Sequence, residues 1–136
     1  MIHAGFSELK RAFFVHSNAS VDKDSISYNL LLFYAVESGL KSIYLRWNNI
    51  LTTEKIADEK LTKSHNLSKW VQKLYLPASV SGPCPEFKLT RNNKQEHYDV
   101  GQVHQAWRYG IEIDQNDQEK LIRWLETVRS LIEERI

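Results

Sequence analysis

The chain has 136 residues and is poor in several features that mark particular protein classes. Its single cysteine, Cys84, excludes an internal disulfide and fits a reducing compartment. Cys84 lies between two prolines, away from any expected helix start, so we assign it no catalytic role. The longest apolar run, from Leu30 to Val36, is far too short to span a bilayer, and the first residues lack the pattern of a signal peptide. We therefore expect a cytoplasmic protein with no membrane association.

Motifs that require a bound group are also missing. The sequence contains no glycine-rich phosphate loop, no Gly-x-Ser-x-Gly and no His-Glu-x-x-His. The five histidines are too scattered to indicate a metal site, so we expect neither a metal nor a cofactor. The sequence is rich in apolar residues: 42% of its residues are hydrophobic, which is ample for one packed core. A chain of this length has room for a single domain, residues 1–136.

Apolar residues recur at helical spacing in five places, which predicts an all-α fold. We expect an antiparallel helical bundle of about five helices with one long loop over residues 78–99. The loop has no helical period, apart from a short extended piece at 87–89. The first expected helix ends near His16, and the second runs from about Ser25 to Trp47 with Asp24 or Ser25 as its N-cap. The third starts at Asn66 as N-cap and is stopped by Pro77. The fourth carries Val100, Val103, His104 and Trp107 with Gly110 as its C-terminal cap, and the fifth opens with a capping box of Asn116 and Glu119.

The second helix gives the strongest signal. One stripe along it contains Ile26, Leu30, Phe33, Glu37, Leu40, Tyr44, Trp47 and Leu51, and a neighbouring stripe contains Leu32, Val36, Gly39, Ile43 and Ile50. A helix that is apolar on two faces should be the central one. Gly39 lowers helix propensity, so we expect it to permit the close approach of another backbone.

Glu37 is the exception within its stripe. A carboxylate among apolar neighbours needs a cationic partner, because burying it unpaired is very unfavourable. Lys41, one turn further on, is one candidate, and Arg108 from another helix is our choice. Two interpretations stay open: an ion pair that orients two helices, or a ligand-binding or catalytic site.

A second polar constellation lies within the long loop. Arg91, followed by Asn92, stands six positions before His97. Arginine can stabilise a phosphate and histidine can move a proton, which is the minimum for metal-independent RNA cleavage. The surrounding segment is basic: from residue 60 to residue 94 it contains Lys60, Lys63, Lys69, Lys73, Lys88, Arg91 and Lys94 against the single acid Glu86. Acids outnumber bases after residue 98, so the charge suits a phosphate-binding face, a self-complementary dimer or a merely uneven surface.

Three motifs in order resemble the HEPN superfamily of small helical bundles. They are Leu30-Leu-Leu-Phe-Tyr-Ala-Val-Glu37-Ser-Gly-Leu-Lys41, then Ser64-His65-Asn66-Leu67, and then Ala106-Trp107-Arg108-Tyr109-Gly110. The resemblance covers about residues 20 to 130 in short pieces, and the positions that match it are Glu37, Lys41, His65, Arg108 and Tyr109.

The resemblance implies a homodimer and a role in RNA cleavage, nucleotide binding, toxin–antitoxin pairs or antiviral defence. Catalytic members have Arg-x4–6-His on the late helix, whereas no histidine follows Arg108 in this chain. Either Arg91, Asn92 and His97 supply that motif from an unusual position, or the chain is non-catalytic, which we favour.

Three functions follow. The first is a HEPN-like module of a bacterial defence or stress system that binds RNA, a nucleotide or a partner protein encoded nearby. The second is a metal-independent endoribonuclease in which Arg91 and His97 act across a dimer. The third is a structural interaction protein whose charged pairs only orient helices.

Overall fold

The computed structural model describes residues 2–91 and 96–136. Over these residues the fold is all-α, as predicted, and the five longer α-helices correspond to the five expected ones. They are α1 (Phe6–Ser17), α2 (Ile26–Trp47), α4 (Leu67–Lys73), α6 (Val103–Arg108) and α7 (Gln115–Arg135). Two four-residue helices, α3 (Glu59–Thr62) and α5 (Ala78–Ser81), and two 3-10 turns, η1 (Thr53–Lys55) and η2 (Val100–Gln102), complete the described elements.

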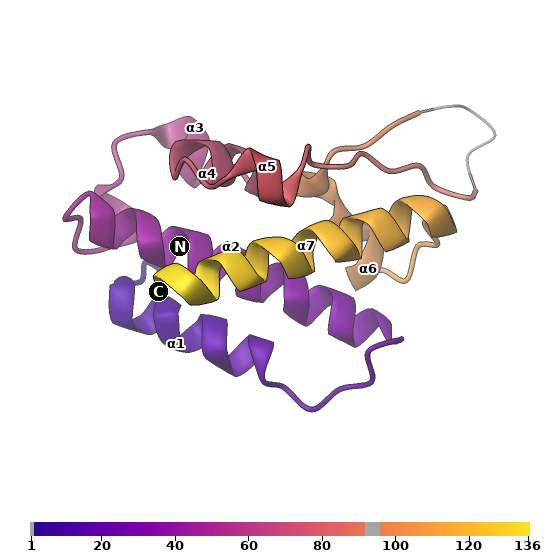
Figure 1. Cartoon of the computed structure of the whole chain (residues 1–136), viewed down its shortest axis with the longest axis horizontal. Coiled ribbons are helices and arrows are strands. Elements are labelled where there is room, and N and C mark those ends of the chain that lie inside the picture. The colour runs from indigo at the N-terminus through magenta and orange to yellow at the C-terminus, as the bar shows by residue number, and fades with distance from the viewer. Residues whose placement is uncertain (1, 92–95) are drawn as a thin grey trace.

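The central position expected for α2 is confirmed. α1 runs antiparallel to α2 and to α7, while α3, α4 and α5 form a layer on the other side (Figure 1). α2 packs against α1, α4, α6 and α7, so its apolar residues are covered on several sides. The largest fully buried side chains of the core are Trp70, Trp107, Phe13, Phe33, Phe87, Leu32, Leu40, Ile43, Leu45, Leu61, Leu67 and Leu74.

The stripe that contains Glu37 is buried only in its middle. Ile26, Trp47 and Leu51 at its ends are exposed, because α1 and α7 pack on the neighbouring faces of α2. Gly39 does permit a close approach, although of side chains rather than backbone. A methyl group built there would lie 2.7 Å from Phe13 of α1 and 2.7 Å from Ile132 of α7.

Two helix boundaries differ from the prediction. The cap of α7 is Asp114, whose carboxylate accepts the N–H of Asp117, and not Asn116. The start is earlier because Ile113 is bridged to Leu89, so the chain turns into the helix directly after that bridge. α4 already ends at Lys73, before Pro77 is reached.

The segment 78–99 is a loop for most of its described length, and α5 is the addition that the sequence did not predict. The extended piece at 87–89 is confirmed by two isolated bridges, Phe87 to Tyr98 and Leu89 to Ile113. Asn92 lies outside the described residues. In the described part of the chain, no helix has both the length and the apolar content that crossing a membrane requires.

Candidate functional site

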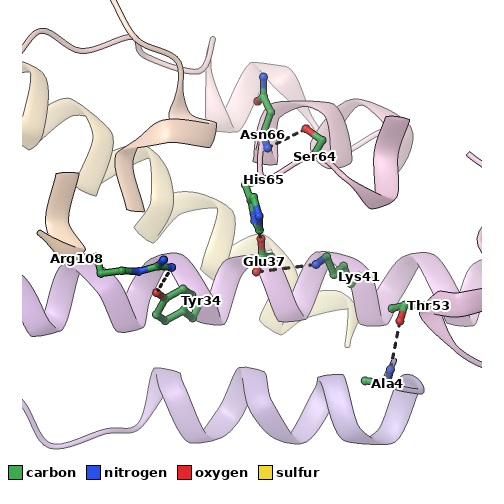
Figure 2. A network of polar contacts seen from close by, with 9 residues as sticks. All are labelled: Ala4, Tyr34, Glu37, Lys41, Thr53, Ser64, His65, Asn66 and Arg108. Carbon is green, nitrogen blue, oxygen red and sulfur yellow. Dashed lines mark hydrogen bonds and ion pairs between the residues drawn. The ribbon is translucent and has the colours of Figure 1, made fainter. Parts of the chain in front are cut away.

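The site forms along the face of α2 that looks toward the α3–α4 layer. Figure 2 shows Tyr34, Glu37 and Lys41 following one another on this helix, with His65 descending onto Glu37 from the turn before α4. Arg108 arrives from the end of α6. The side chains therefore come from three separate elements, and α2 sets their spacing.

Glu37 is largely buried, with 16% of its side chain exposed. Its Oε2 lies 3.0 Å from Nδ1 of His65, and its Oε1 lies 3.9 Å from Nζ of Lys41. A partner for the carboxylate is therefore present, as its position in an apolar stripe required. Two residues, one on the same helix and one from the next layer, share its negative charge.

The pairing of Glu37 with Arg108 is wrong. An Nη of Arg108 instead donates a hydrogen bond to the hydroxyl of Tyr34, at 3.1 Å. Tyr34 lies nearly one turn before Glu37, so the guanidinium reaches α2 beside the carboxylate and not upon it (Figure 2). The contact with Tyr34 raises the pKa of Arg108, which keeps the exposed side chain cationic. Tyr109, the next residue, is exposed.

His104 is a member of the cluster that the sequence did not identify as functional. Its ring packs between Phe33, at 5.1 Å, and His65, at 4.8 Å between centroids. The residue is buried, and Nδ1 has no hydrogen-bond partner among the described residues. Burial lowers the pKa of His104 from its usual value, and the nearby His65 and Arg108 lower it further. Both effects disfavour the protonated form of the ring.

His65 has a local reason for its position. Ser64 Oγ accepts the N–H of Asn66, and the Asn66 side chain caps α4 by accepting the N–H of Ser68. These two turns fix the backbone on either side of His65 and aim its ring at Glu37 (Figure 2). Because Nδ1 faces the carboxylate, Nε2 is directed away from it.

A pocket of about 370 Å³ opens beside Lys41 and His65. Its polar walls are His3, Lys41, Thr53, Thr62, Lys63 and His65, and its apolar walls are Ile2, Ile56 and Trp70. Thr53 is fixed to the N-terminal segment, since its hydroxyl accepts the N–H of Ala4 at 3.2 Å. No aspartate or glutamate belongs to this described lining. The carboxylate of Glu37 contacts Lys41 and His65, and Lys63 adds a further positive charge, so the pocket has a net positive charge.

Arg91 and His97 lie apart from this site. Arg91 is exposed in the turn after Leu89 and lines a shallow hollow with Phe87 and Tyr98. His97 is exposed, and its Nδ1 lies 3.8 Å from Oε2 of Glu86. No hydrogen bond or ion pair connects Arg91 to His97 in the part of the chain that is described. Cys84 is partly buried, and this burial raises the pKa of its thiol to about 12, far from a reactive thiolate.

Within the described residues, no three His, Cys, Asp or Glu side chains are arranged to hold a metal ion. Comparison of the chain with protein-family models, with curated proteins and with solved structures finds no match. The resemblance to the HEPN superfamily therefore stays a prediction from the motifs.

Proposed function

We propose that the chain is a HEPN-like helical module that binds RNA or a nucleotide through its phosphate groups. The observation that carries this proposal is that Lys41 and His65 contact the carboxylate of Glu37 while Arg108 reaches the same face of α2 at Tyr34. Lys41 and Arg108 together carry two positive charges, which exceed the one negative charge of Glu37. An anion that approaches this face meets a surplus of positive charge.

The adjoining pocket supports the same proposal. Lys63 extends the cationic surface beyond Lys41, while Trp70 and Ile56 give the pocket an apolar floor. Its volume of about 370 Å³ lies in the range of small-molecule sites. A phosphate ester fits both parts, because its charged group can contact the lysines while its organic part contacts the apolar wall.

The test is a titration of single-stranded RNA and of a mononucleotide at two salt concentrations. Arg108→Ala should weaken RNA binding and reduce the slope of log K against log salt by about one, as expected for one lost phosphate contact. Arg123→Ala, an exposed arginine on α7, is the matched control and should leave both unchanged. If Arg108→Ala and Arg123→Ala bind RNA equally well, the proposed face is wrong.

The biological setting of the proposal is a bacterial defence or stress system in which the chain forms a homodimer. It follows from the resemblance alone. A gene for a nucleotidyltransferase or an ATPase next to the gene for this chain would support a two-part system, and sedimentation of the purified protein as a monomer would contradict the homodimer.

A metal-independent ribonuclease is the second candidate, and the contact between Glu37 and His65 is what favours it. A carboxylate on Nδ1 orients an imidazole and leaves Nε2 to accept a proton, here from a ribose 2′-hydroxyl. The 2′-oxygen would then bond to the adjacent phosphorus, and the bond from phosphorus to the 5′-oxygen would break, with the leaving oxygen taking a proton from water. Arg108 of α6, which contacts α2 at Tyr34, would stabilise the added negative charge.

A further inference from the structure

Three helices of this chain end in the same backbone motif, and one of them uses an unusual residue. After α2, α4 and α6 the chain passes through a residue with positive φ: Asn49 at 53°, Tyr75 at 52° and Gly110 at 66°. In each case the next N–H reaches back to the helix, from Ile50 to Leu45, from Leu76 to Val71 and from Ile111 to Ala106. This is the Schellman motif, in which glycine or asparagine is the favoured residue at the left-handed position.

Tyr75 does not fit that preference. Its Cβ makes the left-handed conformation unfavourable, whereas Asn49 and Gly110 suit it. The ring does not compensate by packing, because 91% of Tyr75 is exposed to solvent. The backbone of Tyr75 closes α4, whereas its exposed ring contributes nothing to the core, which points to a function of the ring outside the fold.

The surroundings of Tyr75 show what that function requires. Tyr75 lies at one edge of a cleft of about 300 Å³ between α3 and α4, which is also lined by Lys60, Lys69 and Lys73. Asp58 is the one acid in this lining; it caps α3 through the N–H of Leu61 and lies 3.6 Å from Nζ of Lys73. Among the described residues, no ion pair neutralises Lys60 or Lys69.

We infer that this cleft binds single-stranded RNA, with one base stacked on the ring of Tyr75 and its phosphates on Lys60 and Lys69. The inference rests on the proposed function and extends it to a second surface. An exposed aromatic ring beside unpaired lysines is the combination by which proteins hold single strands without reading their sequence. An acidic protein partner fits less well, because lysine is depleted in protein–protein interfaces.

The test uses the variant Tyr75→Gly, which removes both the ring and the strain. Affinity for a short oligouridylate, measured by fluorescence anisotropy, should fall roughly 5- to 150-fold, the effect of losing one stacked base. The thermal midpoint of the variant should rise, because glycine is at ease at positive φ. Tyr75→Trp keeps a stacking surface and should keep the affinity near that of the original chain.

Asn49→Gly is the matched control, since it changes the same backbone position of another helix without removing a ring. It should leave RNA affinity unchanged. An oligonucleotide with abasic positions separates stacking from charge: it should bind Tyr75→Gly and the original chain equally, while Lys69→Gln weakens it.

The outcomes are distinct. If Tyr75→Gly binds oligouridylate as tightly as the original chain while Arg108→Ala binds it more weakly, the inference fails and the proposed function stands. If the original chain binds no RNA at all, both fail. If the original chain binds polyglutamate more tightly than RNA and Tyr75→Gly loses that binding, the surface belongs to an acidic protein and the inference is overturned.

Discussion

The carboxylate of Glu37 lies 3.0 Å from Nδ1 of His65, although 28 positions separate the two residues in the sequence. This contact connects the central helix α2 to the turn before α4, and therefore connects two layers of the fold. His65 in turn lies against the buried ring of His104. The polar cluster thus extends from His65, which is half exposed, to His104 in the core, and Lys41 and Arg108 lie on either side of it.

Replacing Glu37 with glutamine should separate the possible roles of this cluster. The amide keeps the shape and one acceptor but loses the charge that faces His65 and Lys41, so we expect a loss of about 1 kcal/mol in the free energy of unfolding. Thermal unfolding followed by circular dichroism measures it, with Glu133→Gln on the exposed side of α7 as control. The proposed function predicts a modest gain in RNA affinity, because a negative charge has been removed from a cationic face.

A different result would favour the third interpretation of the sequence. If Glu37→Gln is less stable and yet binds RNA and nucleotides as the original chain does, the cluster only orients helices. The same stability loss in Glu133→Gln would show that the effect is not specific to the buried contact.

The sequence predicted the helical fold and the anomaly at Glu37 because both depend on local patterns. The period of apolar residues in α2 identifies a central helix, and a carboxylate among them requires a partner whatever the tertiary structure is. Asn66 is confirmed as the cap of α4, and of the two candidates for α2, Asp24 and Ser25, the structure shows Ser25. Caps can be predicted for the same reason, since a capping side chain bonds within its own turn.

The identity of the partner was beyond the sequence. Arg108 and His65 both lie on elements that meet α2, and only the relative rotation of α6 and α4 decides which of them reaches Glu37. The sequence places His104 on the apolar face of its helix, and that position is correct. Its membership of the polar cluster depends on the contact between its ring and that of His65, which no spacing in the sequence reveals. A histidine among apolar residues of a buried helical face was the one available signal.

The stability of the fold should depend on His104 in mildly acidic solution. The pKa of His104 is lowered in the folded chain by burial first, and then by His65 and Arg108, with Glu37 and the backbone of Gly101 acting in the opposite direction. Below its ordinary value near 6.5, the unfolded chain binds a proton that the folded chain resists, so stability falls as the pH falls through that range. Above that pH neither the folded nor the unfolded chain binds a proton at His104, so the effect on stability disappears.

Urea unfolding at about pH 7.5 and about pH 5.5 measures this dependence. The variant His104→Phe keeps a ring against Phe33 but cannot be protonated, so it should lose less stability between the two conditions than the original chain does. His97→Ala removes an exposed histidine and should follow the original chain. Equal losses in the original chain and in His104→Phe would contradict the assignment of this pH dependence to His104.

The ribonuclease candidate makes a prediction that distinguishes two histidines. Single-stranded RNA is incubated with the purified protein in the presence of EDTA, and products are separated on a denaturing gel. If the chain is a ribonuclease of the kind that the structure favours, cleavage should fall by about 10²-fold or more in His65→Ala, because the group that accepts the 2′-hydroxyl proton is lost. His97→Ala should cleave normally, since His97 lies beside Glu86 and not in the cluster.

The opposite result, in which His97→Ala loses cleavage and His65→Ala keeps it, would identify Arg91 and His97 as the catalytic residues, as the motif in the sequence first indicated. RNA that stays intact with every variant, while Arg108→Ala still weakens binding, would show a module that holds RNA without cutting the substrates tried.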